Sequence, residues 1–429
     1  MADHSEVRDT LQAAFAIAHR PWIWLDEARV QHLHKLSFND ASFSASRFWD
    51  MPSQKLFITD VVMSTPCVKE LSISMQGENF ELEPAIVCAW FIHVRTTLTS
   101  LVFMNKIVPQ TNVLDKLGGT ESLLQNLQLK YAYIPTINPA IHIFPALIDL
   151  SLVVADLRKP RNLELLLTSC PKLKSLLLNN TSFLEDSPTR SSRLELCSSS
   201  LKILYIQNGL KGVDSLVLHA QKLRELHIRN MSLDLFELVQ SKEHRISFME
   251  MSICNANIAT LRLGEGADKL IQLQIVPKNY EALAKWDNIY QNISNASNLL
   301  ELRITNMSIC AGRCIDINKL ATTFPRICLL ELDYENASDE SMAIGPRFEK
   351  LRVLVLNAKK KLRSTFTDWV AWLLEKCSSL HRLEIRLHDF EDDHERATNQ
   401  NTLLRAFTSS IISIGRKYPQ LVVEVTYFR

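Results

Sequence analysis

The residues of this chain best suited to holding a metal ion are two cysteines four positions apart, Cys310 and Cys314. A zinc site combines such a pair with a second pair of Cys or His ligands at a matching spacing. The next candidates, Cys328 and His381, lie 14 and 67 residues beyond Cys314, in positions that belong to a sequence repeat. We therefore expect packed or loop thiols, and no metal site.

His32 and His34 are a second pair of metal-ligand types, but a solvated face of an extended segment explains them as well. Gly264 and Gly266 follow a short apolar segment without the third glycine and crossover helix of a nucleotide site, which indicates a turn. No G-x-S-x-G motif is present, and only 10 of 429 residues are glycine. We expect no catalytic residue, no cofactor and no enzymatic activity.

The charge balance argues against partners that are recognised by charge alone. The chain has 48 Lys and Arg against 47 Asp and Glu, a formal net charge of +1, so no overall field attracts nucleic acid or anionic lipid. The basic run at residues 359–363 could contact phosphate or serve in nuclear import, but a solvated loop is the favoured interpretation.

Several features predict a cytoplasmic or nuclear protein. The N-terminus lacks the basic start and apolar run of a secretory signal, and no 18 apolar residues follow one another. The nine cysteines are odd in number and scattered, which is typical of reduced thiols in an intracellular protein. With 46% hydrophobic residues, the chain has ample material for a large core.

A recurring phrase, L-x-x-L-x-L, organises the chain. It is often followed by two polar residues, a small one and another apolar one, as in LKSLLLNNTSF and LRELHIRNMSL. The mean step between phrases is about 27 residues, within the period of leucine-rich repeats. Fourteen copies begin at Leu33, Val68, Leu98, Leu124, Leu147, Leu173, Leu201, Leu223, Phe248, Leu270, Leu299, Ile327, Leu351 and Leu380.

The phrase predicts an α/β solenoid of horseshoe shape. Its central alternation is that of a short strand with one buried face, and a single coil cannot bury its apolar edge without neighbours. We expect one parallel sheet on the concave face and helices on the convex face. Segments with helical spacing, such as RNLELLLTSC and DWVAWLLEKC, precede the phrases, whereas residues 87–92 could be either a convex helix or a buried strand.

Two parts of the chain are expected. Residues 1–32 carry no phrase and predict an N-terminal helical cap, and residues 33–429 form one leucine-rich-repeat domain of about 14 repeats. Residues 421–425 read as a last strand after a helical pattern at 403–418, which together would form a C-terminal capping coil.

One arrangement is more particular than the phrase alone: a helix ending in L-L-x-x-C, followed by the phrase. It occurs at residues 166–176 and 374–380, and in degraded form at 197–201 and 324–327. This arrangement resembles the repeats of F-box/leucine-rich-repeat proteins, especially those of plants. The resemblance covers roughly residues 50–425.

The resemblance implies a protein-interaction module like the substrate-recognition arm of a ubiquitin-ligase receptor, with cullin-type ligase components among its partners. Members of the family carry an F-box before the repeats, but residues 1–32 contain no L-P-x-x-L/I motif. We therefore expect this chain to show no recognisable F-box. The alternatives are a small-molecule or hormone sensor with a concave pocket, and a scaffold unrelated to ubiquitin ligases.

Alternation along the strands predicts which side chains point out of the inner sheet. We expect a protein partner on the concave face of a monomer, with no nucleic-acid or membrane partner. The same alternation places Glu331, Asp333, Val355 and Asn357 outward. Some of the predicted contact residues are apolar side chains expected to be exposed, and others are Tyr or Arg, which are enriched at interfaces. The predicted contact residues are Leu177, Ile203, Tyr205, His227, Arg229 and Arg303.

Overall fold

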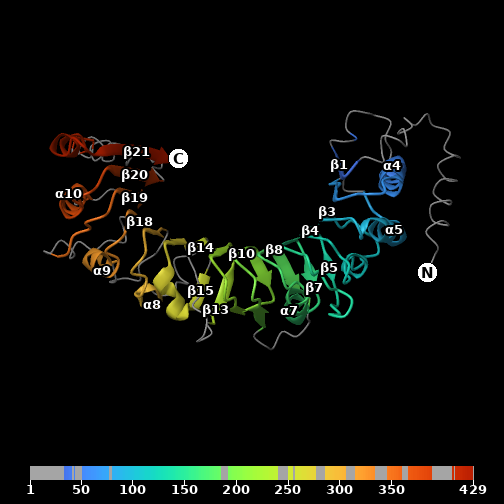
Figure 1. Ribbon diagram of the computed structural model, residues 1–429. Coiled ribbons are helices and arrows are strands. Elements are labelled where there is room, and N and C mark those ends of the chain that lie inside the picture. The colour runs from blue at the N-terminus through green and yellow to red at the C-terminus, as the bar shows by residue number, and fades with distance from the viewer. Residues whose placement is uncertain are drawn as a thin grey trace, which may run out of the picture. The chain divides into compact units, whose positions relative to one another are not determined.

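The computed structural model divides into two compact units, Met1–Gln221 and Lys222–Arg429, which we call unit 1 and unit 2. Each consists of parallel strands with further elements behind them (Figure 1). The expected cap at residues 1–32 lies outside the described residues. The structure describes residues 33–40, 43, 51–76, 80–184, 192–239, 250–254, 257–276, 286–305, 315–333, 345–359, 366–388, 408–409 and 411–428.

Unit 1 contains a parallel sheet whose strands pair in chain order, apart from two short extra strands. Those two, β5 (Tyr133–Ile134) and β7 (Asp156–Leu157), pair with each other, and β7 also pairs with the end of β8. The main strands are β1 (Lys35–Asn39), β2 (Glu70–Ser74), β3 (Ser100–Met104), β4 (Asn126–Lys130), β6 (Asp149–Val153), β8 (Ser175–Phe183) and β10 (Ile203–Lys211).

Unit 2 repeats the same parallel pairing in chain order. Its last strand follows a helical stretch at residues 411–417, as the sequence predicts. The strands are β12 (Glu225–Arg229), β14 (Glu250–Cys254), β16 (Gln272–Val276), β17 (Glu301–Ile304), β18 (Leu329–Asp333), β19 (Val353–Lys359), β20 (Arg382–His388) and β21 (Val422–Phe428).

Every one of the fourteen phrases begins two residues before a strand. Leu173 precedes β8 at Ser175, for example, and Leu299 precedes β17 at Glu301. The leucine-rich-repeat solenoid with a parallel sheet is therefore confirmed. The reason is local: the first leucine anchors the incoming turn in the core, and the alternation that follows gives the strand one buried face.

The phrase leucines form the core. In β8, Leu173 just before the strand and Leu176 and Leu178 within it have no exposed surface, while Ser175 and Leu177 between them are half-buried. Fully burying such a side chain is worth about 1.5–3 kcal/mol, and each repeat contributes several. Stability thus comes from contacts between neighbouring repeats.

Helices lie behind the sheet in both units (Figure 1). Residues 87–92, which the sequence left open between helix and strand, belong to helix α5, and Trp90 and Phe91 on it are fully buried. Trp369 of α10 is buried in the same way. The helices are α4 (Met51–Ser64), α5 (Pro84–Val94), α6 (Leu114–Leu117) and α7 (Pro160–Thr168) in unit 1, and α8 (Trp286–Ile293), α9 (Ile317–Thr323) and α10 (Phe366–Lys376) in unit 2.

The outer layer is not helical throughout. In unit 1, β9 (Arg193–Cys197) and β11 (Ser215–His219) pair in parallel behind the sheet, and in unit 2 so do β13 (Ser232–Leu238) and β15 (Asn257–Arg262). The glycines near residue 265 lie in a short 3-10 helix, Gly264–Lys269. Alternating apolar residues, as in RLELC and SLVLH, explain the strands.

The residue five positions after the start of several inner strands adopts the left-handed conformation. This holds for Tyr131, Val154, Asn180, Asn208 and Asn230, whose φ values lie between 53° and 57°. Asn tolerates this conformation best among residues with a side chain. The left-handed conformation at this position therefore gives a physical reason for the polar residue that so often follows the phrase. By the same reasoning, the β-branched Val154 is strained there.

Candidate functional site

The candidate site is the face of the inner sheet in each unit that points away from the core, which we call the open face. Its side chains come from the first, third and fifth residues of each inner strand, which alternate with buried ones. All six predicted contact residues occupy such positions. Unit 1 carries three of them and unit 2 the other three.

In unit 1 the structure brings Leu177, Ile203 and Tyr205 together, and we call them the apolar cluster. Leu177 of β8 lies directly opposite Tyr205 of β10 in the parallel register, and Ile203 precedes Tyr205 by two residues on the same side of its strand. All three are half-buried, whereas Leu204 and Ile206, which alternate with Ile203 and Tyr205 along β10, are buried in the core.

On β6, β8 and β10 the open-face positions directly beside the apolar cluster carry uncharged side chains. Ser151 of β6 lies opposite Leu177, and Ser175 lies opposite Ile203. Asn179 and Gln207 occupy the next pair of open-face positions on β8 and β10. A surface of large apolar side chains bordered on these strands by hydroxyl and amide groups can bury area against a partner without desolvating a charge there.

In unit 2, His227 and Arg229 lie on the open face of β12. The Nε2 atom of His227 is 3.8 Å from Glu225 Oε2 and 3.9 Å from Glu250 Oε1 on the neighbouring strand. Glu225 and Glu250 are opposite each other in register, so the imidazole stands beside two like charges. Arg229 is exposed.

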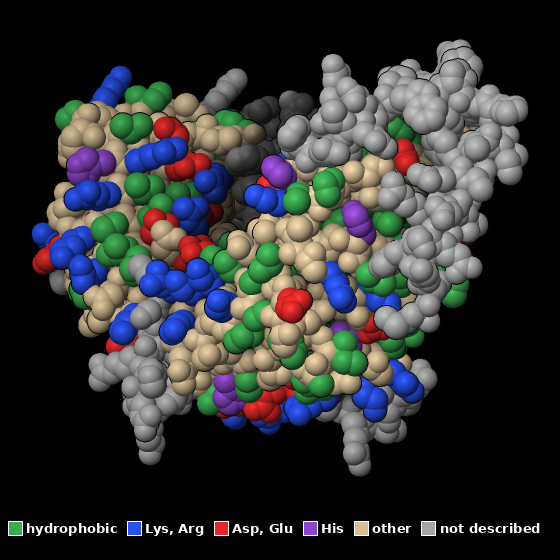
Figure 2. Space-filling view, turned by 45° about the vertical axis from the view of Figure 1, so that its right-hand side comes forward, with side chains coloured by type: hydrophobic (Ala, Val, Ile, Leu, Met, Phe, Trp, Pro, Cys, Tyr) green, Lys and Arg blue, Asp and Glu red, His purple; other side chains and the backbone are tan. Residues whose placement is uncertain are grey.

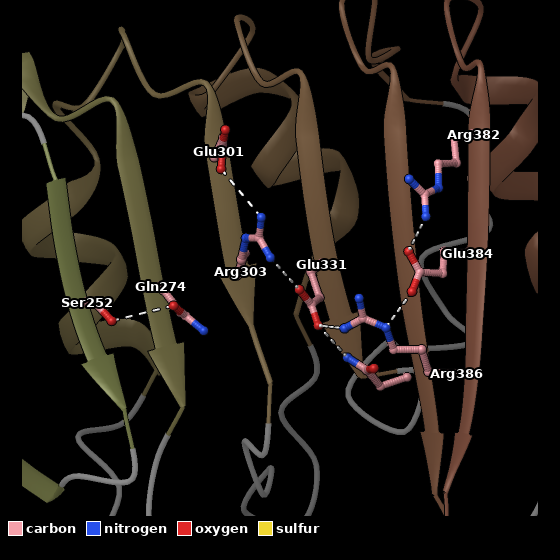
Figure 3. A network of polar contacts seen from close by, with 9 residues as sticks. Ser252, Gln274, Glu301, Arg303, Glu331, Arg382, Glu384 and Arg386 are labelled. Atoms are coloured by element: carbon pink, nitrogen blue, oxygen red, sulfur yellow. Dashed lines mark hydrogen bonds and ion pairs between the residues drawn. The ribbon is translucent and has the colours of Figure 1, made fainter. Parts of the chain in front are cut away.

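The third residue of unit 2, Arg303, belongs to an ion-pair network (Figure 3). Its guanidinium lies 3.6 Å from a Glu301 oxygen and 3.5 Å from Oε2 of Glu331. The other oxygen of Glu331 accepts a hydrogen bond of 2.8 Å from Arg386 Nη1 and one of 3.2 Å from Asn357 Nδ2. Glu331 is only 6% exposed.

The network continues across β20 and β21. Arg386 Nε donates to Glu384 at 2.7 Å, and Arg382 lies 3.3 Å from Glu384 and 2.7 Å from Glu424. Each arginine in it thus already serves two carboxylates. Arg303 therefore has less capacity to bind a partner than its residue type alone indicates.

Four residues that alternation places outward are in fact buried: Glu331, Asp333, Val355 and Asn357 are at most 6% exposed. Alternation predicts on which side of the strand a residue lies. It does not predict the exposed fraction of that residue, because long side chains of neighbouring residues can cover it. This part of the open face is therefore more tightly packed than predicted.

The remaining candidates either lie outside the described residues or make structural contacts. Cys310, Cys314 and His32 lie outside the described residues, as does most of the basic run at 359–363. His34 Nδ1 lies 3.0 Å from the carbonyl oxygen of Cys67, a structural contact. In the space-filling view, basic and acidic side chains lie beside one another with hydrophobic ones scattered between them (Figure 2).

A cavity of about 420 Å³ lies at the end of α10, away from the open face. Arg347, Glu375 and Lys417 bring both signs of charge to its wall, beside Leu374 and Tyr418. Apolar ligands prefer pockets lined mainly by hydrophobic side chains. This cavity therefore does not support the sensor alternative. In the described part of the chain, no helix combines the length and apolarity needed to cross a membrane.

Comparison with known proteins gives one informative relative. No family model matches the chain. The chain is 28% identical over 407 residues to an F-box/LRR-repeat protein of Arabidopsis thaliana, an alignment that covers 94% of this chain and 92% of the relative. The resemblance to F-box/leucine-rich-repeat proteins is confirmed.

The cysteines of the F-box/LRR-like arrangement differ in their surroundings. Cys170 and Cys377 are buried at the ends of α7 and α10, and burial raises the pKa of each thiol to about 12. Cys197, in the degraded copy, is exposed at the end of the outer strand β9. The first two are core residues, whereas Cys197 is accessible.

Proposed function

We propose that this protein is a leucine-rich-repeat recognition module whose protein partner docks on the open face of unit 1, at the apolar cluster. The observation that carries the proposal is the side-by-side placement of Leu177, Ile203 and Tyr205 on two paired strands. Scattered exposed apolar residues are ordinary, but contiguous ones on a face bordered by neutral polar groups favour a binding site.

On unit 2, taken by itself, the open-face residues best suited to polar contacts with a partner are Arg229 and His227. Arg229 is exposed, and interfaces favour arginine because it combines contact area with several hydrogen-bond donors. Arg303 would first have to leave Glu301 and Glu331, so we assign it a mainly structural role.

Affinity purification followed by mass spectrometry, with the parent chain and Tyr205→Ala side by side, tests the proposal. The dissociation constant of the recovered partner is then measured for both, and we expect a loss of about 1–2 kcal/mol. A loss of that size is about 5- to 30-fold in affinity.

A second test variant is Ile203→Ala, and Ile141→Ala is its matched control. Ile141 is also in unit 1 and is 51% exposed, but it lies in a turn and not on an inner strand. The same side chain is thus removed at and away from the cluster. Equal affinity for the Ile203 variant, the Tyr205 variant and the parent would refute docking at the cluster.

The finer proposal, that the module serves a cullin-type ubiquitin ligase, is supported by the F-box/LRR-repeat relative. Recovery of cullin-ligase subunits with the partner would favour it, while a stable partner without them indicates a scaffold. Because the sequence shows no F-box motif, we expect this chain not to bind the ligase adaptor directly. Stoichiometric adaptor binding through residues 1–32 would show a divergent F-box there.

A further inference from the structure

Three side chains with metal-binding atoms meet on the outer strands of unit 1. Cys197 at the end of β9 lies directly opposite His219 at the end of β11, and Glu195 precedes Cys197 by two residues on the same side of its strand. Their sulfur, nitrogen and oxygen ligand atoms all lie within 4.8 Å of one another. Glu195 Oε1 and His219 Nε2 are 2.7 Å apart.

The donor set is that of a zinc site. Zinc in proteins is bound by thiolate, imidazole and carboxylate, and sites with three protein ligands leave a fourth position for water. Hard ions such as Mg²⁺ and Ca²⁺ prefer oxygen ligands alone, so the thiol and imidazole select against them. Two paired strands fix the Cα positions of all three residues.

Accessibility sets Cys197 apart from the other cysteines of the F-box/LRR-like arrangement. The equivalent cysteines Cys170 and Cys377 are buried, whereas Cys197 is exposed. His219 and Glu195 are also accessible, with side chains 35% and 42% exposed. An ion could therefore reach all three from solvent without any movement of the core.

A second group of three, Glu225, His227 and Glu250 in unit 2, also has its ligand atoms within 4.8 Å of one another. It offers two carboxylates and one imidazole but no sulfur. The two groups can therefore be told apart by a probe that reports sulfur ligation, and the thiol-containing group is the one whose chemistry selects zinc.

We propose that Glu195, Cys197 and His219 form a zinc-binding site on the outer face of unit 1, with water as the fourth ligand. An ion about 2.0–2.1 Å from nitrogen and oxygen needs these two atoms about 3.3 Å apart, and rotation of the half-exposed Glu195 side chain supplies the small opening from 2.7 Å. The site is independent of the open face and of the partner proposed for it.

Zinc binding to a thiol depends on pH because the ligand must lose its proton. Burial, and then the charges of Glu195 and Glu164, raise the pKa of Cys197. Zinc binds the thiolate, so binding has to displace the thiol proton. Zinc binding by this site should release a proton and weaken as the pH falls.

The test uses the full chain, freed of metal by a chelator and titrated with Co²⁺ as a spectroscopic substitute for zinc. We expect one Co²⁺ per chain with a thiolate-to-cobalt charge-transfer band, which added Zn²⁺ removes. Cys197→Ser should abolish the band, and His219→Gln should weaken binding at least tenfold.

The matched controls are Cys67→Ser and His34→Gln, an exposed cysteine and an exposed histidine of the same unit that lie outside the group. Both should bind Co²⁺ like the parent. Circular dichroism checks that each variant is folded; Cys197→Ser changes an exposed side chain and leaves the core intact. The proposal is overturned if the parent shows no thiolate band, or if the band persists in Cys197→Ser.

Discussion

Replacing Arg386 with alanine tests whether the ion-pair network stabilises unit 2. Arg386 is the nearest cation to Glu331, with a nitrogen–oxygen distance of 2.8 Å, and Glu331 is only 6% exposed. The substitution leaves Glu331 with Arg303 at 3.5 Å and the amide of Asn357 at 3.2 Å. A nearly buried carboxylate would thus lose its shortest charged contact.

The structure sets the size of the effect. Removing one partner of a fully buried ion pair costs about 3–5 kcal/mol because the other charge stays desolvated. The Arg386 side chain is 28% exposed, so water screens part of the interaction, and we expect about 2 kcal/mol. Arg382→Ala on the same strand is the control: Arg382 and Glu424 are 47% and 45% exposed, and their pair should contribute about 0–1 kcal/mol.

Hydrogen exchange resolved by peptide measures both variants, because it reports on β18 and β19 separately from unit 1. Amides of these strands should exchange faster in Arg386→Ala than in Arg382→Ala. Adding Glu331→Gln to Arg386→Ala should restore part of the protection, since it removes the buried charge and keeps an acceptor for Asn357. Equal protection in the two single variants would refute the conclusion that the buried Glu331 carboxylate depends on Arg386.

Two further predictions concern stability and thiol chemistry. Val154→Asn should raise stability by about 0.5–1 kcal/mol in urea unfolding, because a β-branched residue is strained at a φ of 53°; a lower urea midpoint would contradict this. At pH 8 a thiol reagent should label the exposed Cys67 and Cys197 in the native protein, but Cys170 and Cys377 only after unfolding. The thiols of Cys170 and Cys377 have a pKa of about 12 in the folded protein and of 9.0 in the unfolded chain. Their contribution to the free energy of unfolding should therefore be fully present below pH 9 and fall as the pH rises toward 12. A urea midpoint that stays constant between pH 8 and pH 10.5 would refute the last point.

The inner sheet could be predicted from the sequence because its signal is local and repeated. Each phrase carries its own anchor leucine and alternation, and each begins two residues before a strand. The outer layer was less predictable. RLELC and SLVLH alternate like strands, but in isolation they compete with the expectation of a convex helix.

The candidate site was predictable only in part, for a similar reason. Alternation places Leu177 and Tyr205 on one face, and the repeat spacing makes them neighbours. It does not show that Arg303 is paired with Glu331, because that depends on long side chains reaching between strands. In the group around Cys197 only Glu195 is close in sequence, and His219 lies 24 residues beyond Glu195, so no compact motif announces the group.

The outer strands also explain why a metal-binding group could arise on this side of unit 1. Paired strands lie about 4.8 Å apart, whereas packed helices lie about 8–10 Å apart. On the outer side, side chains at equivalent positions of neighbouring repeats therefore come within reach of a single ion where the outer layer is a sheet. Cys197 and His219 are opposite each other because β9 and β11 replace helices. The same pairing rule that places Leu177 beside Tyr205 on the open face thus creates a second, chemically distinct surface on the outer face of unit 1.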